Sequence, residues 1–374
     1  MDFMGKKQKI IALLFIILGI VSLTRTVFIL WNDNLPDFST RYDSGILLMQ
    51  DKNPYTNTAS FTTENYPPSA LTLLLPFSLL SYSVASKLWI MLSILAFFLL
   101  FTIIYRTFPI KLMQMSIIFF LTVISFPFKF TLGMGQVNIL ILLFIVLFLT
   151  SLIIKKKVNA ALALSIAVVM KLFPVVYFLS LILHRQWKVF FVASTLIIVF
   201  LLLPVMLFGK EISMHYLTKY FFPLLSGSPT GAYYYNQSVT GFLSRIDASS
   251  VILISRIIFV IVTVFVFFKK RANNFLNVSL LTVLVLLINN FTWQHHLILL
   301  MLPYYFILVN TKSKLILSMT FISYILVAFN IKDPSLFSST FYGNIFLSHG
   351  FFGMLILWVI LLFQNVKIIS RQKV

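Results

Sequence analysis

The sequence predicts an all-α protein that crosses a membrane many times. Its mean hydropathy is +1.00, and 60% of the residues are hydrophobic while 10% are charged, which excludes a soluble globular domain. Apolar runs long enough to span the hydrocarbon core follow one another, separated by short polar breaks. These runs do not alternate polar and apolar residues, so the pattern also excludes a transmembrane β-barrel.

The first apolar run, 10–31, follows a basic N-terminal stretch, as the core of a signal peptide does. The run is longer than a signal sequence requires and no small-residue cleavage site follows it, so we expect an uncleaved first span. In all, the sequence predicts about ten full spans. These spans cover residues 10–31, 84–105, 112–128, 136–154, 187–208, 250–268, 275–292, 295–309, 314–330 and 346–366.

Two further apolar segments do not fit the pattern of full spans. Residues 66–81 form a short segment with several prolines, so we expect a re-entrant or interfacial segment there. Residues 158–183 are interrupted by Lys171 and Pro174, so we expect a broken pair of short helices that turns at these residues.

The basic residues predict the topology, because cytoplasmic loops of membrane proteins are rich in lysine and arginine. Placing the basic clusters in the cytoplasm gives a consistent order of spans, with both termini cytoplasmic. Every carboxylate except Asp2 then lies on the extracytoplasmic side, and so do the polar motifs. The clusters are Lys6 to Lys9, Arg106 with Lys111, Lys155 to Lys157, Arg185 with Lys188, Lys269 to Arg271, Lys312 with Lys314, and Lys367 to Lys373.

This topology predicts that the protein acts at the extracytoplasmic surface of the cell membrane. The cytoplasmic loops are only a few residues long, too short to bind a nucleotide sugar or a partner domain. We expect one transmembrane domain over 1–374, with an outer catalytic loop at 32–68 and a second outer loop at 209–249. Topology also accounts for the net charge of +20, so nucleic acid is not an expected partner.

Several kinds of chemistry have no support in the sequence. The chain has no cysteine, so neither disulfides nor thiol chemistry is expected. It contains no HExxH, DxD, P-loop or GxGxxG motif, which leaves a metalloprotease, a nucleotide-sugar enzyme of the usual kind and an ATPase unsupported. We expect no metal and no cofactor.

Carboxylates gather in the first outer loop, which favours chemistry or ion binding there over an ordinary solvated loop. Asp37 is a candidate general base. The alternative is that Asp37 caps an amphipathic helix over 38–50. Of only nine carboxylates in the chain, this loop holds Asp37, Asp43, Asp51 and Glu64.

Cationic residues provide candidate phosphate ligands. Lys171 lies between two apolar runs, where a lysine is costly unless it meets an anion or snorkels to the surface. Arg245 is either a second phosphate ligand or an ordinary loop arginine. His295 and His296 offer an acid, a base or a hydrogen bond to phosphate, or they pack structurally. As neighbours on a helix they point in different directions, which makes them a poor metal pair.

The polar motifs, in their order along residues 10 to 310, resemble glycosyltransferase family 87, whose members are multi-span enzymes of the GT-C type. Asp51-Lys52 and Asp43 depart from the family's pattern. The matching motifs are Asp37-Phe38-x-x-Arg41-Tyr42, Asn53-Pro54-Tyr55, Tyr66-Pro67-Pro68, Gly135-Gln136-x-Asn138, Lys171-x-x-Pro174, Asn236-Gln237-Ser238 and Trp293-x-His295-His296.

The resemblance implies a GT-C-like fold and an inverting transfer of a hexose, mannose being the first expectation. The donor is a polyprenyl-phosphate sugar, the acceptor is a lipid or glycan hydroxyl, and membrane lipids surround both. Asp37 then acts as the base, with His295 or His296 also catalytic, while Lys171 and Arg245 bind the donor phosphate. Substrate-binding roles fall to Tyr42, Tyr55, Tyr66, Gln136, Asn138, Asn236 and Gln237.

Three other classes compete with this interpretation. A transporter or flippase of lipid-linked saccharides needs polar residues along both halves of its spans, whereas here they lie almost only on the outer side. A polymerase or ligase of such saccharides relies on a large arginine-rich outer loop, whereas 209–249 contains only Arg245. A non-catalytic membrane scaffold would be favoured if the outer carboxylates proved dispensable.

Overall fold

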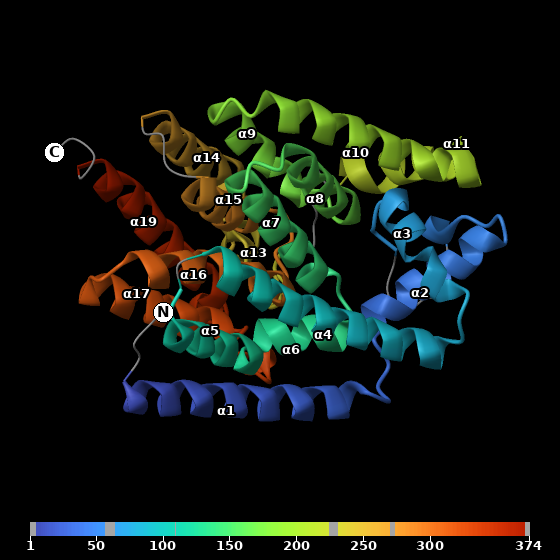
Figure 1. Cartoon of the computed structure of the whole chain (residues 1–374). Coiled ribbons are helices and arrows are strands. Elements are labelled where there is room, and N and C mark those ends of the chain that lie inside the picture. The colour runs from blue at the N-terminus through green and yellow to red at the C-terminus, as the bar shows by residue number, and fades with distance from the viewer. Residues whose placement is uncertain (1–4, 57–63, 109, 224–230, 270–273, 371–374) are drawn as a thin grey trace. The chain divides into compact units, whose positions relative to one another are not determined.

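The computed structural model describes residues 5–56, 64–108, 110–223, 231–269 and 274–370 (Figure 1). Within these ranges the secondary structure is helical, and the only β pairing is an isolated bridge between Asn236 and Trp293. The chain forms two compact units. Unit 1 comprises residues 1–124, 129–175 and 186–226, and unit 2 comprises 125–128, 176–185 and 227–374. The prediction of one domain over 1–374 stays a prediction.

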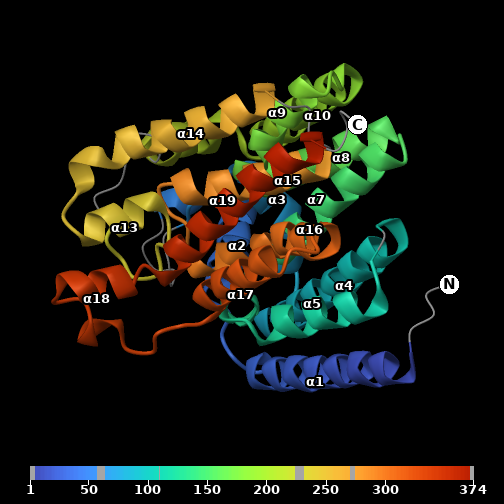
Figure 2. The same cartoon turned by 90° about the vertical axis from the view of Figure 1, so that its left-hand side faces the viewer.

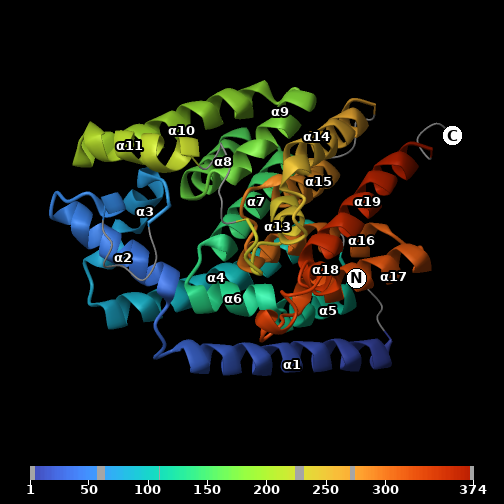
Figure 3. The same cartoon turned by 180° about the vertical axis from the view of Figure 1, so that it is seen from behind.

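In unit 1, α1 (Lys6–Leu30) packs along α5 (Leu112–Ile124), as Figures 1 and 3 show. Phe15 and Phe120 meet with ring centroids 5.4 Å apart. The helices approach closely at Gly19, where an added Cβ would lie 2.5 Å from the ring of Phe119. Glycine therefore allows the two helices to pack, as small residues do between membrane helices.

The apolar run that begins at Leu112 does not continue as one straight helix. It forms α5 and then α6 (Phe126–Met134), and the two are bent by 56°. Pro127 follows the break, where its fixed φ suits the first turn of a new helix. The span predicted over 112–128 is therefore bent near its end and continues to Met134 if the pair counts as one span.

The interior of unit 1 is built on α7 (Asn138–Ile153), which is apolar on all sides and almost wholly buried. It packs against α4 (Tyr82–Thr107) and α8 (Lys157–Met170), and α8 packs in turn against α10 (Trp187–Phe208). The face of α8 is rich in buried alanine, so α10 comes close enough for a hydrogen bond from Ser165 Oγ to Ala193 O at 3.2 Å.

The region expected to be an outer loop, 32–68, is largely ordered as helix. It contains α2 (Pro36–Met49) and η1 (Pro54–Thr56), while 57–63 lies outside the described residues. Next comes α3 (Pro68–Ser78), which packs on α2 (Figure 3). Gly45 permits this contact, because an added Cβ there would meet Ser78 Oγ at 2.1 Å.

Unit 2 is centred on α15 (Asn274–Ile288), whose residues are nearly all buried and which packs against α14, α16 and α19 (Figure 2). Helices α17 and α19 also pack closely, with a hydrogen bond from Ser323 Oγ to Gly353 O at 2.6 Å. The remaining helices of this unit are α9 (Phe178–Leu183), α13 (Val239–Arg245), α14 (Ile252–Lys269), α16 (Met301–Asn310), α17 (Lys314–Ala328), α18 (Phe341–Phe346) and α19 (His349–Ser370).

Among the described residues, four helices are long and apolar enough to cross a bilayer, and the bent pair α5–α6 makes a fifth if it counts as one span. The all-helical membrane architecture is thus confirmed, but the count of about ten spans is not. The shorter apolar helices contain 10–17 residues when α19 is counted from His349 to Gln364. The expected break in 158–183 is present, since α8 ends at Met170 and η2 (Phe173–Tyr177) follows. The four longest spans are Lys6–Leu30, Tyr82–Thr107, Trp187–Phe208 and Ser249–Phe267.

The second expected outer loop, 209–249, also contains helices. Its first part forms α11 (Lys210–Tyr216) and the π-helical turn η3 (Leu217–Phe221), and its last part contains α13. Residues 224–230 lie outside the described residues. The amphipathic helix considered over 38–50 is thus present as α2, whereas the helices of 209–249 were not predicted.

Candidate active site

Asp37 lies in the first turn of α2, where the helix dipole stabilises a negative charge. The residue before Pro36, Leu35, is the N-cap, so the interpretation of Asp37 as the N-cap is wrong. The Asp37 carboxylate instead accepts a hydrogen bond from Gln136 Nε2. Its side chain is 13% exposed, which leaves the carboxylate partly accessible from outside the fold.

Arg41, one helical turn after Asp37, is the central cation of this cluster and is 6% exposed. Its Nη1 donates to Asp37 O at 2.8 Å and lies 3.6 Å from Asp37 Oδ1. Its Nε lies 3.6 Å from Glu64 Oε1, and its guanidinium lies over the Tyr66 ring at 4.1 Å. Burial opposes the charge, but Glu64, Tyr66 and Asp37 outweigh it, so the pKa of Arg41 lies above its ordinary value.

Glu64 is the second carboxylate of the cluster and is 2% exposed. Its Oε2 accepts from Ser44 Oγ at 2.8 Å, and its Oε1 accepts from the backbone N–H groups of Asn65 and Tyr66 at 2.9 Å. A buried carboxylate with this many donors is held in one position. Glu64 therefore fixes both the backbone before α3 and the Arg41 guanidinium.

Gln136 joins this cluster from the turn between α6 and α7. Gly135 makes the turn possible: its φ is +68°, and an added Cβ would lie 2.5 Å from the Cβ of Phe38. Because a carboxylate only accepts hydrogen bonds, the NH₂ group of Gln136 faces Asp37 and its Oε1 faces the other way. That Oε1 accepts from Tyr66 OH at 2.6 Å.

Lys171 reaches the same amide from the break after α8. Its Nζ donates to Asn138 Oδ1 at 3.2 Å and to Gln136 Oε1 at 3.5 Å, and lies 5.6 Å from the Tyr66 ring centre. Lys171 lies in the connection between α8 and η2, outside the apolar helices. Burial lowers the pKa of its ammonium to about 7, although Asp37 works in the opposite direction.

Tyr55 supports the cluster from η1. Its OH donates to Tyr66 O at 2.7 Å, and Tyr220 OH of η3 donates to Tyr55 O at 2.7 Å. Burial raises the pKa of Tyr55 well above its ordinary value and also raises that of Tyr66, so both phenols remain protonated donors at neutral pH. In this structure Tyr55 holds Tyr66, and Tyr66 itself lies in the cluster.

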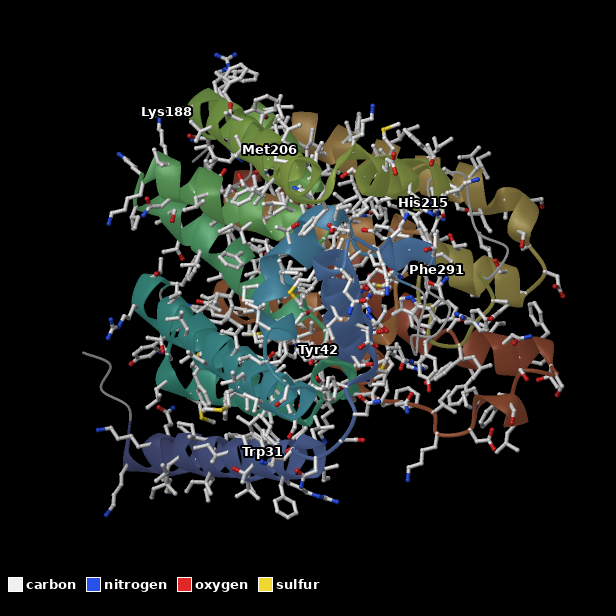
Figure 4. The ribbon with its side chains drawn as sticks, turned by 90° about the vertical axis from the view of Figure 1, so that its right-hand side faces the viewer. Trp31, Tyr42, Lys188, Met206, His215 and Phe291 are labelled. Atoms are coloured by element: carbon white, nitrogen blue, oxygen red, sulfur yellow. The ribbon has the colours of Figure 1, made fainter. Side chains whose placement is uncertain are left out.

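Tyr42 lies on α2 but does not join the cluster. Its OH donates to Leu80 O at 2.7 Å, and its ring packs against Phe38 and Tyr82 with centroids 6.5 and 5.3 Å away. Figure 4 labels the Tyr42 side chain. This packing favours a supporting role for Tyr42, and the substrate-binding role stays a prediction.

We call the set Asp37, Arg41, Glu64, Tyr66, Gln136, Asn138 and Lys171 the unit 1 polar cluster. It places a carboxylate and an ammonium group on opposite ends of one amide, Gln136, within a unit that is otherwise packed with apolar side chains. A carboxylate can accept a proton from a hydroxyl, and an ammonium group can offset the charge of a phosphate. The arrangement therefore suits a reaction in which a hydroxyl forms a bond to a carbon atom and displaces a phosphate from it.

The remaining predicted site residues belong to unit 2. His295 and His296 lie in η5 (Gln294–Leu300), are 5% and 7% exposed, and have ring planes at 89° with centroids 4.4 Å apart. The two rings therefore pack edge to face, which does not bear out the expectation that they point in different directions. Their catalytic role stays a prediction, because no contact within unit 2 tests it.

Asn236 and Gln237 form a hydrogen-bonded junction in unit 2. Asn236 Nδ2 donates to Gly231 O and Asn290 O, while its Oδ1 accepts from Ser238 and Thr292. The side chain of Gln237 is equally saturated: it donates to Tyr234 O and Leu347 O and accepts from Gly350 N and Phe351 N. These bonds favour a structural role for both amides.

Arg245 is buried at the end of α13, where its guanidinium donates to groups of the protein itself. Nε and Nη2 bond to Ser348 Oγ at 3.0 and 2.9 Å, and Nη1 bonds to the carbonyl groups of Tyr233 and Asn236 at 2.9 and 2.8 Å. Burial lowers its pKa to about 10, so it stays charged at neutral pH. These contacts favour a role in holding the 233–236 turn.

Neither Arg41 nor Glu64 was predicted as an individual site residue, although both are central to the cluster. Arg41 occurs inside the first quoted motif, and Glu64 stands two residues before Tyr66. The sequence does contain a signal for Arg41, because an arginine four residues after an acid on a short helix predicts an i,i+4 ion pair. The pairing of Arg41 with Glu64 could be seen only once the fold was known.

Comparison with known proteins identifies one family. The model of glycosyltransferase family 87 matches residues 63–289. The matched region contains Glu64, Tyr66, Gln136 and Lys171 of the unit 1 polar cluster; it begins after Asp37 and Arg41 and ends before the two histidines. No curated protein matches the chain.

Proposed function

The chain belongs to glycosyltransferase family 87, and on this premise we propose that it transfers a hexose from a polyprenyl-phosphate donor at the outer surface of the cell membrane. The acceptor is a hydroxyl of a lipid or glycan, and mannose is the sugar we propose first. One observation carries the proposal: the Asp37 carboxylate and the Lys171 ammonium bond to the same Gln136 amide. A general base and a phosphate ligand are thus held close together.

In the proposed reaction the acceptor hydroxyl replaces the phosphate at the anomeric carbon of the sugar. Asp37 takes the hydroxyl proton while the acceptor oxygen forms its bond to that carbon. The bond between the carbon and the phosphate oxygen breaks, and its electron pair leaves with the polyprenyl phosphate. Attack opposite the leaving group inverts the configuration of the sugar.

Lys171 is proposed to offset the negative charge that grows on the departing phosphate. Its ammonium is held by Asn138 and Gln136, so it does not need to reorganise when the charge develops. Phosphate stabilises the protonated amine, which opposes the effect of burial on its pKa. We therefore expect Lys171 to be fully charged once the donor is bound.

Arg41 and Glu64 are proposed to act through Asp37 and not on the substrate. Arg41 bonds to the backbone and faces the carboxylate of Asp37, and Glu64 holds the guanidinium from its other side. The ion pair keeps the carboxylate turned toward Gln136, at the start of a helix that Pro36 and Phe38 fix in place.

The test is a transfer assay with purified protein, radiolabelled polyprenyl-phosphate mannose, glucose or arabinose, and a membrane lipid extract. Wild-type protein should transfer label from one donor to a lipid or glycan product. Asp37→Asn keeps the shape of the side chain but cannot take the proton, so the rate should fall by about 10²–10⁴. Binding of the donor should survive in this variant.

Asp43→Asn and Asp51→Asn are the matched controls, because both carboxylates belong to the same region but lie outside the unit 1 polar cluster. They should stay within a few-fold of the wild-type rate. A fully active Asp37→Asn protein would remove Asp37 as the base while leaving the donor class intact. Failure to transfer label from any polyprenyl-phosphate sugar would overturn the donor class itself.

A further inference from the structure

Helix α1 carries an arginine within its apolar length. The helix has 25 residues and is about 37 Å long, which exceeds the thickness of the hydrocarbon core. Trp31, labelled in Figure 4, follows its last residue, and tryptophan favours the boundary between membrane and water. Arg25 lies about 9 Å from Trp31 along the helix axis.

A hollow of about 510 Å³ opens beside Arg25 on the surface of unit 1. Its wall includes Leu18, Val21 and Ile29 of α1, which are 51%, 61% and 58% exposed, and α6 contributes Lys129. We call this feature the α1–α6 groove. It combines an apolar wall with two exposed cations on neighbouring helices.

The bend between α5 and α6 explains why the groove exists. Helix α1 packs closely against α5 at Gly19, where the Phe119 ring leaves no room for a side chain. The chain then turns by 56°, so α6 cannot continue along α1 as α5 does. The two approach again at Leu30, whose Cδ2 would lie 3.6 Å from a Cβ on Gly133. The lining of the groove runs along α1 from Leu18 to Leu30 and includes Lys129 of α6.

Charge distinguishes the groove from ordinary lipid-facing surface. Its lining contains Arg25 and Lys129 but no carboxylate, so its net charge is positive. Within the described ranges, neither cation has an ion pair or a hydrogen bond to the protein. A positive charge inside a membrane helix is costly unless an anion or water meets it, so a headgroup phosphate is a suitable partner for these two cations.

We propose that the α1–α6 groove binds one anionic phospholipid of the surrounding bilayer, with its phosphate between Arg25 and Lys129 and an acyl chain along Leu18 and Val21. The hydroxyl of Ser22 also lines the groove and can donate to a phosphate or ester oxygen, whereas that of Thr26 donates to Ser22 O at 2.9 Å. No carboxylate or amide side chain is present to hold sugar hydroxyls. These features favour a phospholipid over the saccharide-bearing donor, and this inference does not depend on the proposed function.

The experiment measures lipid retained by the purified protein. Wild-type protein is reconstituted in nanodiscs of equal phosphatidylglycerol and phosphatidylcholine, extracted in mild detergent and examined by native mass spectrometry. It should retain about one phosphatidylglycerol in preference to phosphatidylcholine. Each of Arg25→Gln and Lys129→Gln should weaken retention about fivefold, and the double variant about thirtyfold, if each cation contributes as cations near a membrane surface do.

Lys188→Gln is the matched control, since Lys188 is an exposed cation of unit 1 on α10, away from the groove (Figure 4). It should retain lipid as the wild type does. Val21→Trp provides a second test that keeps both charges: the indole fills the groove at an exposed position and should displace the phospholipid. Melting temperatures measured without added lipid check that each variant is folded.

Three outcomes would overturn the inference. The double variant could retain as much phosphatidylglycerol as the wild type, which would show that Arg25 only extends toward the aqueous phase. Wild-type protein could hold the two phospholipids equally, which would show that the groove does not select charge. Polyprenyl phosphate added in competition could replace phosphatidylglycerol at equal concentration, which would assign the groove to the donor lipid.

Discussion

Gln136 donates a hydrogen bond to the carboxylate of Asp37, although 99 positions separate the two residues in the chain. This bond exists because the turn at Gly135 lies directly against the first turn of α2, where Phe38 stacks on Trp89 with ring centroids 5.2 Å apart. The candidate base is thus positioned by a turn that only glycine can form without strain.

Gly135→Ala should therefore destabilise the protein and impair transfer together. The new methyl group meets the buried Phe38, and a φ of +68° costs a non-glycine residue about 1–2 kcal/mol before any clash. We expect a total loss of about 2–4 kcal/mol, measured by thermal or denaturant unfolding in detergent. Gly133→Ala is the control, because its Cβ makes only an ordinary contact with Leu30 and alanine favours a helix. Equal stability of the two variants would contradict the role assigned to the turn.

Glu64→Gln should cost about 3 kcal/mol of unfolding free energy, because it leaves the buried Arg41 without one of its two carboxylates. Unfolding of the purified variant in detergent measures this loss. The double variant Glu64→Gln with Arg41→Met removes the uncompensated charge and should recover part of it. Glu211→Gln, at an exposed position in the first turn of α11, should change stability by less than about 0.5 kcal/mol. Additive losses in the double variant would show that the ion pair does not couple the two residues.

The pH dependence of donor use should report Lys171. A lysine loses its charge as pH rises through its pKa, which is about 7 here, so kcat/KM for the donor should fall above that pH. The profile of kcat should turn at a higher pH, because bound phosphate stabilises the charged amine. In Lys171→Arg the fall of kcat/KM at alkaline pH should disappear, since arginine stays charged.

Lys171→Ala should lower kcat/KM for the donor by about 10–100-fold, the usual effect of losing a hydrogen bond to a charged group. Lys210→Ala, at an exposed position at the start of α11, should leave donor use near normal. Near-normal and equal values for both variants would remove Lys171 from the donor site.

The topology can be tested with single cysteines, because the chain contains none of its own. An impermeant maleimide added to intact cells should label Asp51→Cys and should label Lys156→Cys only after the membrane is opened. Both positions are exposed, so access to reagent should depend only on the side of the membrane. Labelling of Lys156→Cys in intact cells would reverse the predicted orientation. Ser226 is also predicted to face outward and lies outside the described residues. A cysteine at this position can be tested with the same reagent.

Hydropathy and polar interruptions are local signals, so the sequence predicted the helical membrane class and the break at Lys171. Asp37, Gln136 and Lys171 were named as site residues through the resemblance to the family, and their contact was not predicted. It did not predict the 56° bend after Ile124, although Pro127 is a signal for it. Nor did it predict that Glu64 pairs with Arg41. That contact depends on the path of the backbone from α2 to α3, which no local pattern specifies.

The unit 1 polar cluster also has a consequence for biosynthesis. All of its side chains lie between Asp37 and Lys171, and every residue of unit 1 precedes Gly227. A ribosome adds residues from the N-terminus, and membrane helices insert as they emerge, so the contacts around Gln136 can form while the last 148 residues are still being translated. A substitution at Gly135 would then act early, on a nascent chain that has not yet produced most of unit 2, and would expose the half-made protein to quality-control proteases.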